Sequence, residues 1–122
     1  MSWDQEFPPD FHVPRRFAKL VAGGVIEDMS WRNDPCPSFG VKLKDKNWAR
    51  LWVEHPNADL RRGWPRRFTI IIQGDPTVTF GRRILATDDP QTAYDKMVAL
   101  AESRGARARQ GRFKIASEEK AS

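Results

Sequence analysis

The sequence predicts an α+β domain: an antiparallel sheet of four to five strands built from two consecutive hairpins, with a short N-terminal helix and a C-terminal helix packed on one face. Three observations lead to this prediction. Apolar side chains alternate with period two through residues 39–53 and again after residue 67, turn residues separate these segments, and a helical apolar stripe follows Pro90.

The 122 residues suit one domain, which we place at residues 14–105. Residues 1–13 carry prolines among aromatic and acidic side chains, so we expect an extended arm whose aromatic rings either dock on the body or capture a partner. Residues 106–122 are first basic and then acidic with little apolar periodicity, which predicts a basic, disordered tail.

The first helix is expected to begin at Pro14, because proline suits the first helical position. Phe17 and Leu20 give its apolar stripe, and Gly23 stops it. Residues 25–31 alternate poorly and predict only a weak first strand.

The hairpin of residues 34–56 organises the rest of the chain. A turn centred on Lys46 would pair Phe39 with Val53 and Val41 with Leu51, which places the apolar side chains of both arms on one face. The opposite face then carries Lys42, Trp48, Arg50 and Trp52. We expect this mixture of cations and indoles to remain open as a binding surface.

A second hairpin follows a polar loop. Residues 67–73 are rich in β-branched side chains on both faces, residues 74–77 have turn chemistry, and residues 78–87 return as a strand with Phe80 and Ile84 buried. The two strands should therefore lie side by side in the sheet.

Asp89 followed by Pro90 predicts the start of the C-terminal helix, with the Asp89 carboxylate capping free backbone N–H groups. Ala93 and Met97 belong to its apolar stripe. Gly105 is placed for a C-terminal cap. This helix is expected to pack on the sheet.

The net charge is +5, and 14 of the 21 basic residues are arginines. Arginine favours bidentate contact with phosphate or carboxylate. We therefore expect an anionic partner, either nucleic acid or an acidic protein surface. The alternative interpretation is a solvated basic face balanced by Glu54, Asp59 and Asp75.

The leading hypothesis is a small non-enzymatic protein that binds single-stranded nucleic acid, with indoles stacking on bases and cations contacting phosphates. Arg67 and Arg82 are expected to be neighbours across the second hairpin. The predicted binding residues are Lys42, Trp48, Arg50, Trp52, Arg61, Arg62, Arg66, Arg67 and Arg82.

The competing hypothesis is a protein–protein interaction module, such as a regulatory subunit or a mobile-element inhibitor. Five Trp and seven Phe residues supply the rigid aromatic anchors that dominate protein interfaces. The two hypotheses differ in their response to salt, because phosphate contacts weaken steeply as salt is raised.

A third hypothesis is a thiol enzyme that uses Cys36 and His55. The expected register opposes it, because it directs the thiol and the imidazole to opposite faces. We expect a structural Cys36 whose replacement by serine leaves the fold nearly intact. Asp34, Cys36, His55 and Asp59 lack paired metal-ligand spacing, and nucleotide-binding motifs are absent from the sequence, so we expect no metal or cofactor.

The sequence also predicts a cytoplasmic protein without a membrane segment. Its longest apolar runs fall short of the roughly 18 residues that suggest a membrane-spanning helix. The N-terminal residues lack the basic and apolar regions of a secretory signal.

Overall fold

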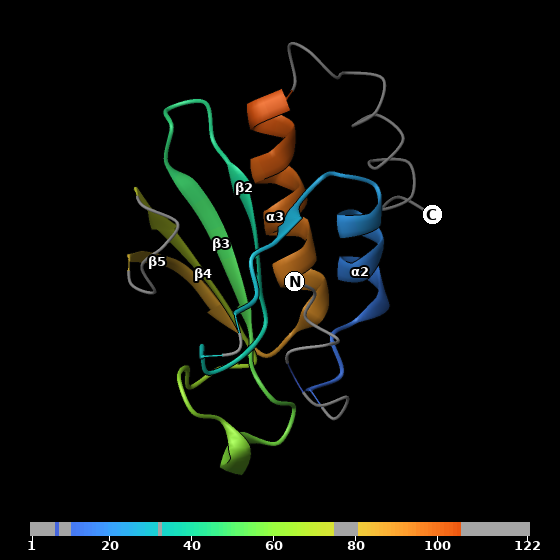
Figure 1. The fold of residues 1–122 in the computed structure, drawn as a ribbon, viewed down its shortest axis with the longest axis vertical. Helices are drawn as coiled ribbons and strands as arrows, with labels where there is room; N and C mark the ends of the chain where they lie inside the picture. The colour runs from blue at the N-terminus through green and yellow to red at the C-terminus, as the bar shows by residue number, and fades with distance from the viewer. Residues whose placement is uncertain (1–6, 8–10, 32, 75–80, 106–122) are drawn as a thin grey trace.

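The computed structural model describes residues 7, 11–31, 33–74 and 81–105. In chain order the elements are α2 (Arg15–Ala22), β1 (Glu27–Asp28), β2 (Ser38–Lys42), β3 (Trp48–Val53), the 3-10 helix η2 (Ala58–Leu60), β4 (Phe68–Gln73), β5 (Arg82–Thr87) and α3 (Pro90–Gly105). The five strands form one antiparallel sheet in the order β1-β2-β3-β4-β5, and Figure 1 shows both helices on the same side of it. The predicted α+β fold is confirmed.

The register of the first hairpin differs from the prediction by two residues. Phe39 lies opposite Leu51, and Val41 lies opposite Ala49. The turn is therefore centred on Asp45, whose carboxylate accepts the N–H of Asn47 at 3.0 Å. Lys46 has φ 74°, a left-handed conformation that closes the tighter turn. The predicted register was wrong, but a shift of two keeps every side chain on its predicted face.

The second hairpin begins at Phe68, which lies opposite Thr87. Arg82 lies opposite Ile72 at the other end of the hairpin, so the expectation that Arg67 and Arg82 are neighbours was wrong. Because the two strands are antiparallel, the residue opposite Arg67 is the one that follows Thr87 in the chain. The expected turn and Phe80 lie in residues 75–80, outside the described residues.

The helix α3 begins at Pro90 as predicted, whereas α2 begins at Arg15, one residue later than expected. Pro14 precedes α2. The Asp89 carboxylate caps α3 by accepting the N–H groups of Gln91 at 3.3 Å and Thr92 at 3.2 Å. Gly105 is the last residue of α3 rather than a cap beyond its end.

The main core fills the space between the helices and the sheet. Its buried side chains include Phe17 and Leu20 from α2, Phe39, Leu51 and Ile70 from the central strands, and Met97 and Val98 from α3. A second apolar cluster, formed by Cys36, Trp52 and Ile71, lies on the opposite side of the sheet, which we call the outer face. Both faces of the sheet therefore carry buried apolar side chains.

The N-terminal segment docks on this body where it is described. Phe7 is buried, and its ring meets the Phe11 ring edge-on at 5.4 Å. Phe11 in turn meets the His55 ring at 5.4 Å. These contacts agree with the docking interpretation, whereas Trp3 and residues 106–122 lie outside the described residues. Neither helix in the described ranges has the length and apolar character needed to cross a membrane.

Thr69 gives a direct test of this packing, because it is fully buried on β4 and its Oγ1 has no hydrogen-bond partner. We expect Thr69→Val to raise the free energy of unfolding by about 1 kcal/mol, since it removes an unsatisfied hydroxyl and keeps the branched shape. Thr69→Ser keeps the hydroxyl, loses a methyl group and should be destabilising. Urea unfolding of the three proteins measures both changes, and a less stable Val variant would contradict the expectation.

Candidate binding surface

The centre of the outer face is covered. Trp52 has 0% exposure and Arg50 has 3%. The Trp64 ring lies 5.8 Å from the Trp52 ring, and the Arg50 guanidinium carbon lies 4.3 Å from it. The expectation of an open face is wrong at Arg50 and Trp52, because a tryptophan from the following loop and a side chain from the same strand close over the indole.

Arg50 is held by groups of the protein itself. Its Nε donates to Ser38 Oγ at 3.0 Å, and its Nη2 lies 3.3 Å from Asp34 Oδ2. Burial raises the pKa of Asp34 and lowers the pKa of Arg50, and in each case it outweighs the attraction of the partner. The ion pair therefore fixes the position of the segment that precedes β2 more than it adds stability.

A more exposed part of the outer face lies beside this closed centre. Lys42 is exposed and lies opposite the half-buried Trp48. Arg83 is exposed and lies opposite Ile71, which belongs to the outer-face cluster. Paired residues share a face of the sheet, so these cations flank Trp48 on one surface. Two strand spacings, about 10 Å, separate Trp48 from the strand that carries Arg83.

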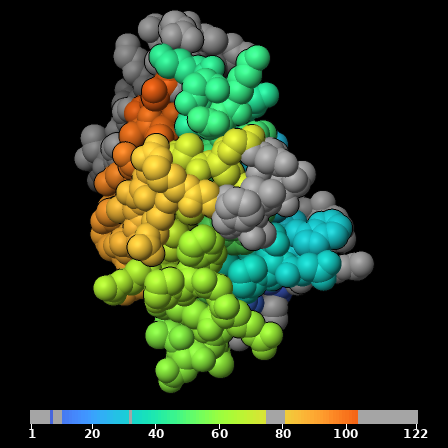
Figure 2. Space-filling view, turned by 90° about the vertical axis from the view of Figure 1, so that its left-hand side faces the viewer, coloured from blue at the N-terminus to red at the C-terminus, as the bar shows by residue number. Residues whose placement is uncertain are grey.

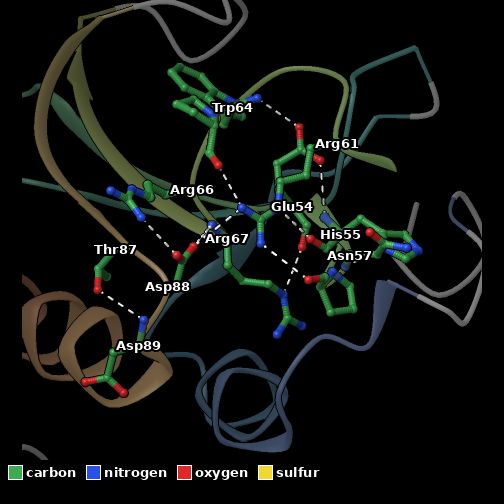
Figure 3. A network of polar contacts seen from close by, with 12 residues as sticks. Glu54, His55, Asn57, Arg61, Trp64, Arg66, Arg67, Thr87, Asp88 and Asp89 are labelled. Atoms are coloured by element: carbon green, nitrogen blue, oxygen red, sulfur yellow. Dashed lines mark hydrogen bonds and ion pairs between the residues drawn. The ribbon is translucent and has the colours of Figure 1, made fainter. Parts of the chain in front are cut away.

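The β3–β4 loop, residues 54–67, is built around a buried carboxylate (Figure 3). Oε2 of Glu54 accepts the N–H groups of Arg62 at 3.2 Å, Gly63 at 2.6 Å and Trp64 at 2.9 Å. Its Oε1 accepts the N–H of His55 at 3.2 Å. Successive backbone N–H groups of this kind form a concave nest that binds anions. Here the anion belongs to the same chain.

Gly63 is required for this loop to approach the rest of the protein. A Cβ atom at this position would lie 2.5 Å from Cγ of Pro35 and 3.3 Å from Oε2 of Glu54. A larger residue would push the loop away from the corner at Pro35 and from the carboxylate. The close approach also carries Trp64 to its place over Trp52.

Arg61 and Arg67 bind backbone carbonyl groups. Arg61 Nε donates to the carbonyl of His55 at 2.8 Å, and two further carbonyl groups of the loop accept from its other nitrogens. Arg67 Nη2 donates to the carbonyl of His12 at 2.6 Å and so ties the N-terminal segment to the loop. Burial lowers the pKa of Arg67, and the charge of Arg61 adds to this. These two guanidinium groups hold the loop in its conformation.

Asp88 joins the loop to the start of α3 (Figure 3). Its carboxylate accepts the N–H of Arg67 at 2.9 Å and pairs with Arg66 at 3.1 Å and Arg61 at 3.5 Å. The N–H of Arg67, with help from the arginine side chains, lowers the pKa of Asp88, so the carboxylate stays charged in mildly acidic solution.

The carboxylate that pairs with the loop arginines is Asp88, which differs from the expected neutralisation of these cations. The alternative interpretation assigned Glu54, Asp59 and Asp75 to neutralise the arginines. Within the described residues the arginine pairs of the loop are made to Asp88, Glu54 binds backbone N–H groups, and Asp75 lies outside that range.

The remaining predicted residues are accessible. Arg62, Arg66 and Arg82 are exposed, although Arg66 also pairs with Asp88. Figure 2 shows that the tip of the first hairpin, β5 and the segment 56–67 share one side of the molecule. Of the predicted set, Trp48, Arg61 and Arg67 are half-buried, and the exposed members are Lys42, Arg62, Arg66 and Arg82. Arg82 lies opposite Ile72, which packs against the main core, so Arg82 is on the helix side of the sheet, whereas the exposed Arg83 is on the outer face.

Sequence reasoning missed Glu54 and Asp88 as organising residues and Trp31 as an exposed aromatic. Trp31 is 48% exposed, and Leu60 of η2 is 52% exposed. The sequence does carry one signal for Glu54, which is its position directly after an apolar strand. A side chain at that position is carried into the interior together with the strand. The role of Asp88 is harder to infer from the sequence, because the residues that it contacts lie some twenty positions earlier in the chain.

The surroundings of Cys36 and His55 give no support to a catalytic pair. Cys36 lies in the apolar outer-face cluster, and burial, reinforced by the Glu54 carboxylate, raises the pKa of its thiol. Nδ1 of His55 already accepts the N–H of Asn57 at 2.9 Å. The described ranges also contain no group of three or more His, Cys, Asp or Glu side chains placed to hold a metal ion.

Comparisons with known proteins give no relative for this chain: no family model matches it, and no curated protein or solved structure is significantly similar. An α+β sheet hosts many unrelated functions. The function therefore has to be inferred from the chemistry of the surface.

We expect Trp52→Ala to lower the free energy of unfolding by about 3–5 kcal/mol, because it opens a large cavity in the outer-face cluster. The exposed Trp31 is the matched control, and Trp31→Ala should change stability by less than about 0.5 kcal/mol. Denaturant unfolding of both variants measures the difference. Equal stability of the two variants would show that Trp52 is not a packing residue.

Cys36 is expected to react with iodoacetamide far more slowly in the native protein than glutathione does at the same pH, because its thiol is buried and protonated. Denaturant should remove the protection. The burial also revises the expected effect of Cys36→Ser, which should cost about 1–3 kcal/mol by burying a new hydroxyl. Rapid native labelling that depends on His55 would instead revive the thiol-enzyme hypothesis.

Proposed function

We propose that this protein is a non-enzymatic cytoplasmic domain that binds an anionic partner, most simply single-stranded nucleic acid, through the side of the molecule seen in Figure 2. One observation carries the proposal: the exposed Lys42 and Arg83 share the outer face of the sheet with the half-buried Trp48. Lys42, Arg62 and Arg83 form no ion pair with any of the residues that the structure describes. They are therefore available to contact a ligand.

Trp48 supplies a surface on which a base can stack. Stacking on an aromatic side chain contributes about 1–3 kcal/mol per base and tolerates any base identity. Lys42 beside it and Arg83 on β5 are placed to reach phosphates on either side of a stacked base. This arrangement supports binding to a flexible single strand with little sequence preference.

The loop adds arginines that need little reordering. Arg62 follows η2 in a segment whose backbone is held by Glu54, and Arg66 is held near the surface by Asp88. A segment whose backbone is already fixed loses less conformational entropy when it binds. The guanidinium fork then suits bidentate contact with phosphate.

Fluorescence titration of the full chain with single-stranded DNA and RNA at low salt tests the proposal. We expect binding that weakens steeply as salt is raised. Lys42→Glu combined with Arg83→Glu, which changes two exposed cations on the same face as Trp48, should lower affinity by at least about tenfold. The control with the same charge change is Lys19→Glu combined with Lys96→Glu, two exposed lysines on the helices. Its smaller effect would locate binding on the proposed side.

Trp48→Ala should weaken binding by about 1–3 kcal/mol if the indole stacks on a base. Trp31→Ala is the control for removal of an accessible indole and should leave affinity unchanged. The proposal fails if the wild-type protein does not bind at low salt, or if the two double charge reversals weaken binding equally.

The second candidate function is a protein–protein interaction module, and the exposure of Trp31 and Leu60 favours it. Large exposed apolar side chains are common anchors in such interfaces. A pull-down from a nuclease-treated lysate at moderate salt tests this alternative. It is supported if one stoichiometric protein is recovered and lost with Trp31→Ala.

A further inference from the structure

We propose that Glu54 is the positioning residue of the arginine-bearing loop: its carboxylate serves as an intramolecular anion that holds three consecutive backbone N–H groups and thereby presents Arg62 to an external anion. This inference rests on the proposed function for the identity of the external ligand. The role of Glu54 within the loop can be measured without that ligand.

The geometry makes Glu54 a determinant of the loop conformation. Four backbone N–H groups converge on its carboxylate, three on Oε2 and one on Oε1. The side chain is fully buried, and in the described part of the chain no basic side chain pairs with it. A buried carboxylate is costly unless hydrogen bonds or charges compensate it. Any loop conformation that withdraws these N–H groups is therefore disfavoured.

In these contacts the backbone and the side chain of Arg62 have different roles. The N–H of Arg62 is the first of the three in the nest, so its backbone is fixed from inside the protein. Its side chain is exposed and has no partner among the described residues. Glu54 thus orders the attachment point of a cation that remains available for phosphate.

The nest also fixes the position of Trp64, whose ring covers the centre of the outer face. Trp64 donates the third N–H, and its ring then lies against Trp52. Gly63 between them allows the close approach to Pro35. Removal of the carboxylate should therefore release both the arginine and the tryptophan, and a small external carboxylate should restore them because the nest has the shape of an anion site.

The test uses Glu54→Ala in the full chain. We expect the amide NMR signals of residues 62–64 to shift and the affinity for single-stranded DNA to fall about tenfold, which corresponds to roughly 1.4 kcal/mol. Acetate should move the amide signals back toward their wild-type positions and restore part of the affinity. Sodium chloride at the same ionic strength should not restore the amide signals.

Asp59→Ala is the matched control, because Asp59 is an exposed carboxylate of the same loop. It should leave the signals of residues 62–64 unchanged. If Glu54→Ala does not fold, Glu54→Gln takes its place, since glutamine keeps one acceptor oxygen for the nest and should give a smaller shift and a smaller loss of affinity. Wild-type signals and affinity in the variant that folds would overturn the inference.

The two proposals can fail separately. If the wild-type protein does not bind single-stranded DNA, the proposed function is lost, whereas acetate-dependent recovery of the amide signals still assigns the positioning role to Glu54. If the wild-type protein binds and the Glu54 variants bind equally well, only the positioning role is lost. Equal effects of acetate and chloride on the amide signals would also overturn that role.

Discussion

A buried carboxylate that no cation neutralises must be surrounded by N–H groups. Glu54 pairs with no basic side chain among the described residues, and it imposes this requirement on the β3–β4 loop. The loop satisfies it by turning three consecutive N–H groups inward. This conformation brings Gly63 against the corner at Pro35 and Trp64 over Trp52. The position of Trp64 over the outer face therefore depends on one buried carboxyl side chain directly after β3.

The arginines divide into two groups with different physical roles. Arg50, Arg61 and Arg67 donate to carbonyl groups or to neighbouring polar side chains, and they fix segments that lack regular secondary structure. Arg62 and Arg82 stay exposed. Arginine suits the first role because its rigid fork reaches several acceptors at once and remains charged when partly buried. A count of basic residues therefore overstates the charge available to a ligand.

The period of the apolar residues was sufficient to predict the fold, because a shift of two residues in the first hairpin left Phe39 and Leu51 on the core face. It could not predict the exposure of the opposite face. Trp52 and Arg50 alternate as outward residues should, yet Trp64, twelve positions after Trp52, covers the indole. That contact depends on the conformation of an irregular loop, which is set by hydrogen bonds to Glu54 and has no periodic signature in the sequence.

The distribution of aromatic side chains bears on the choice between the two functions. Among the residues that the structure describes, most of the Trp and Phe side chains that suggested a protein interface belong to the two apolar clusters or pack against them, as Phe39 and Trp52 illustrate. The large apolar side chains that stay exposed in the described ranges are Trp31 and Leu60. A tight hydrophobic interface needs a larger contiguous apolar patch than two such residues provide. Accessible guanidinium groups and a half-exposed indole instead favour recognition that is led by charge and sensitive to salt.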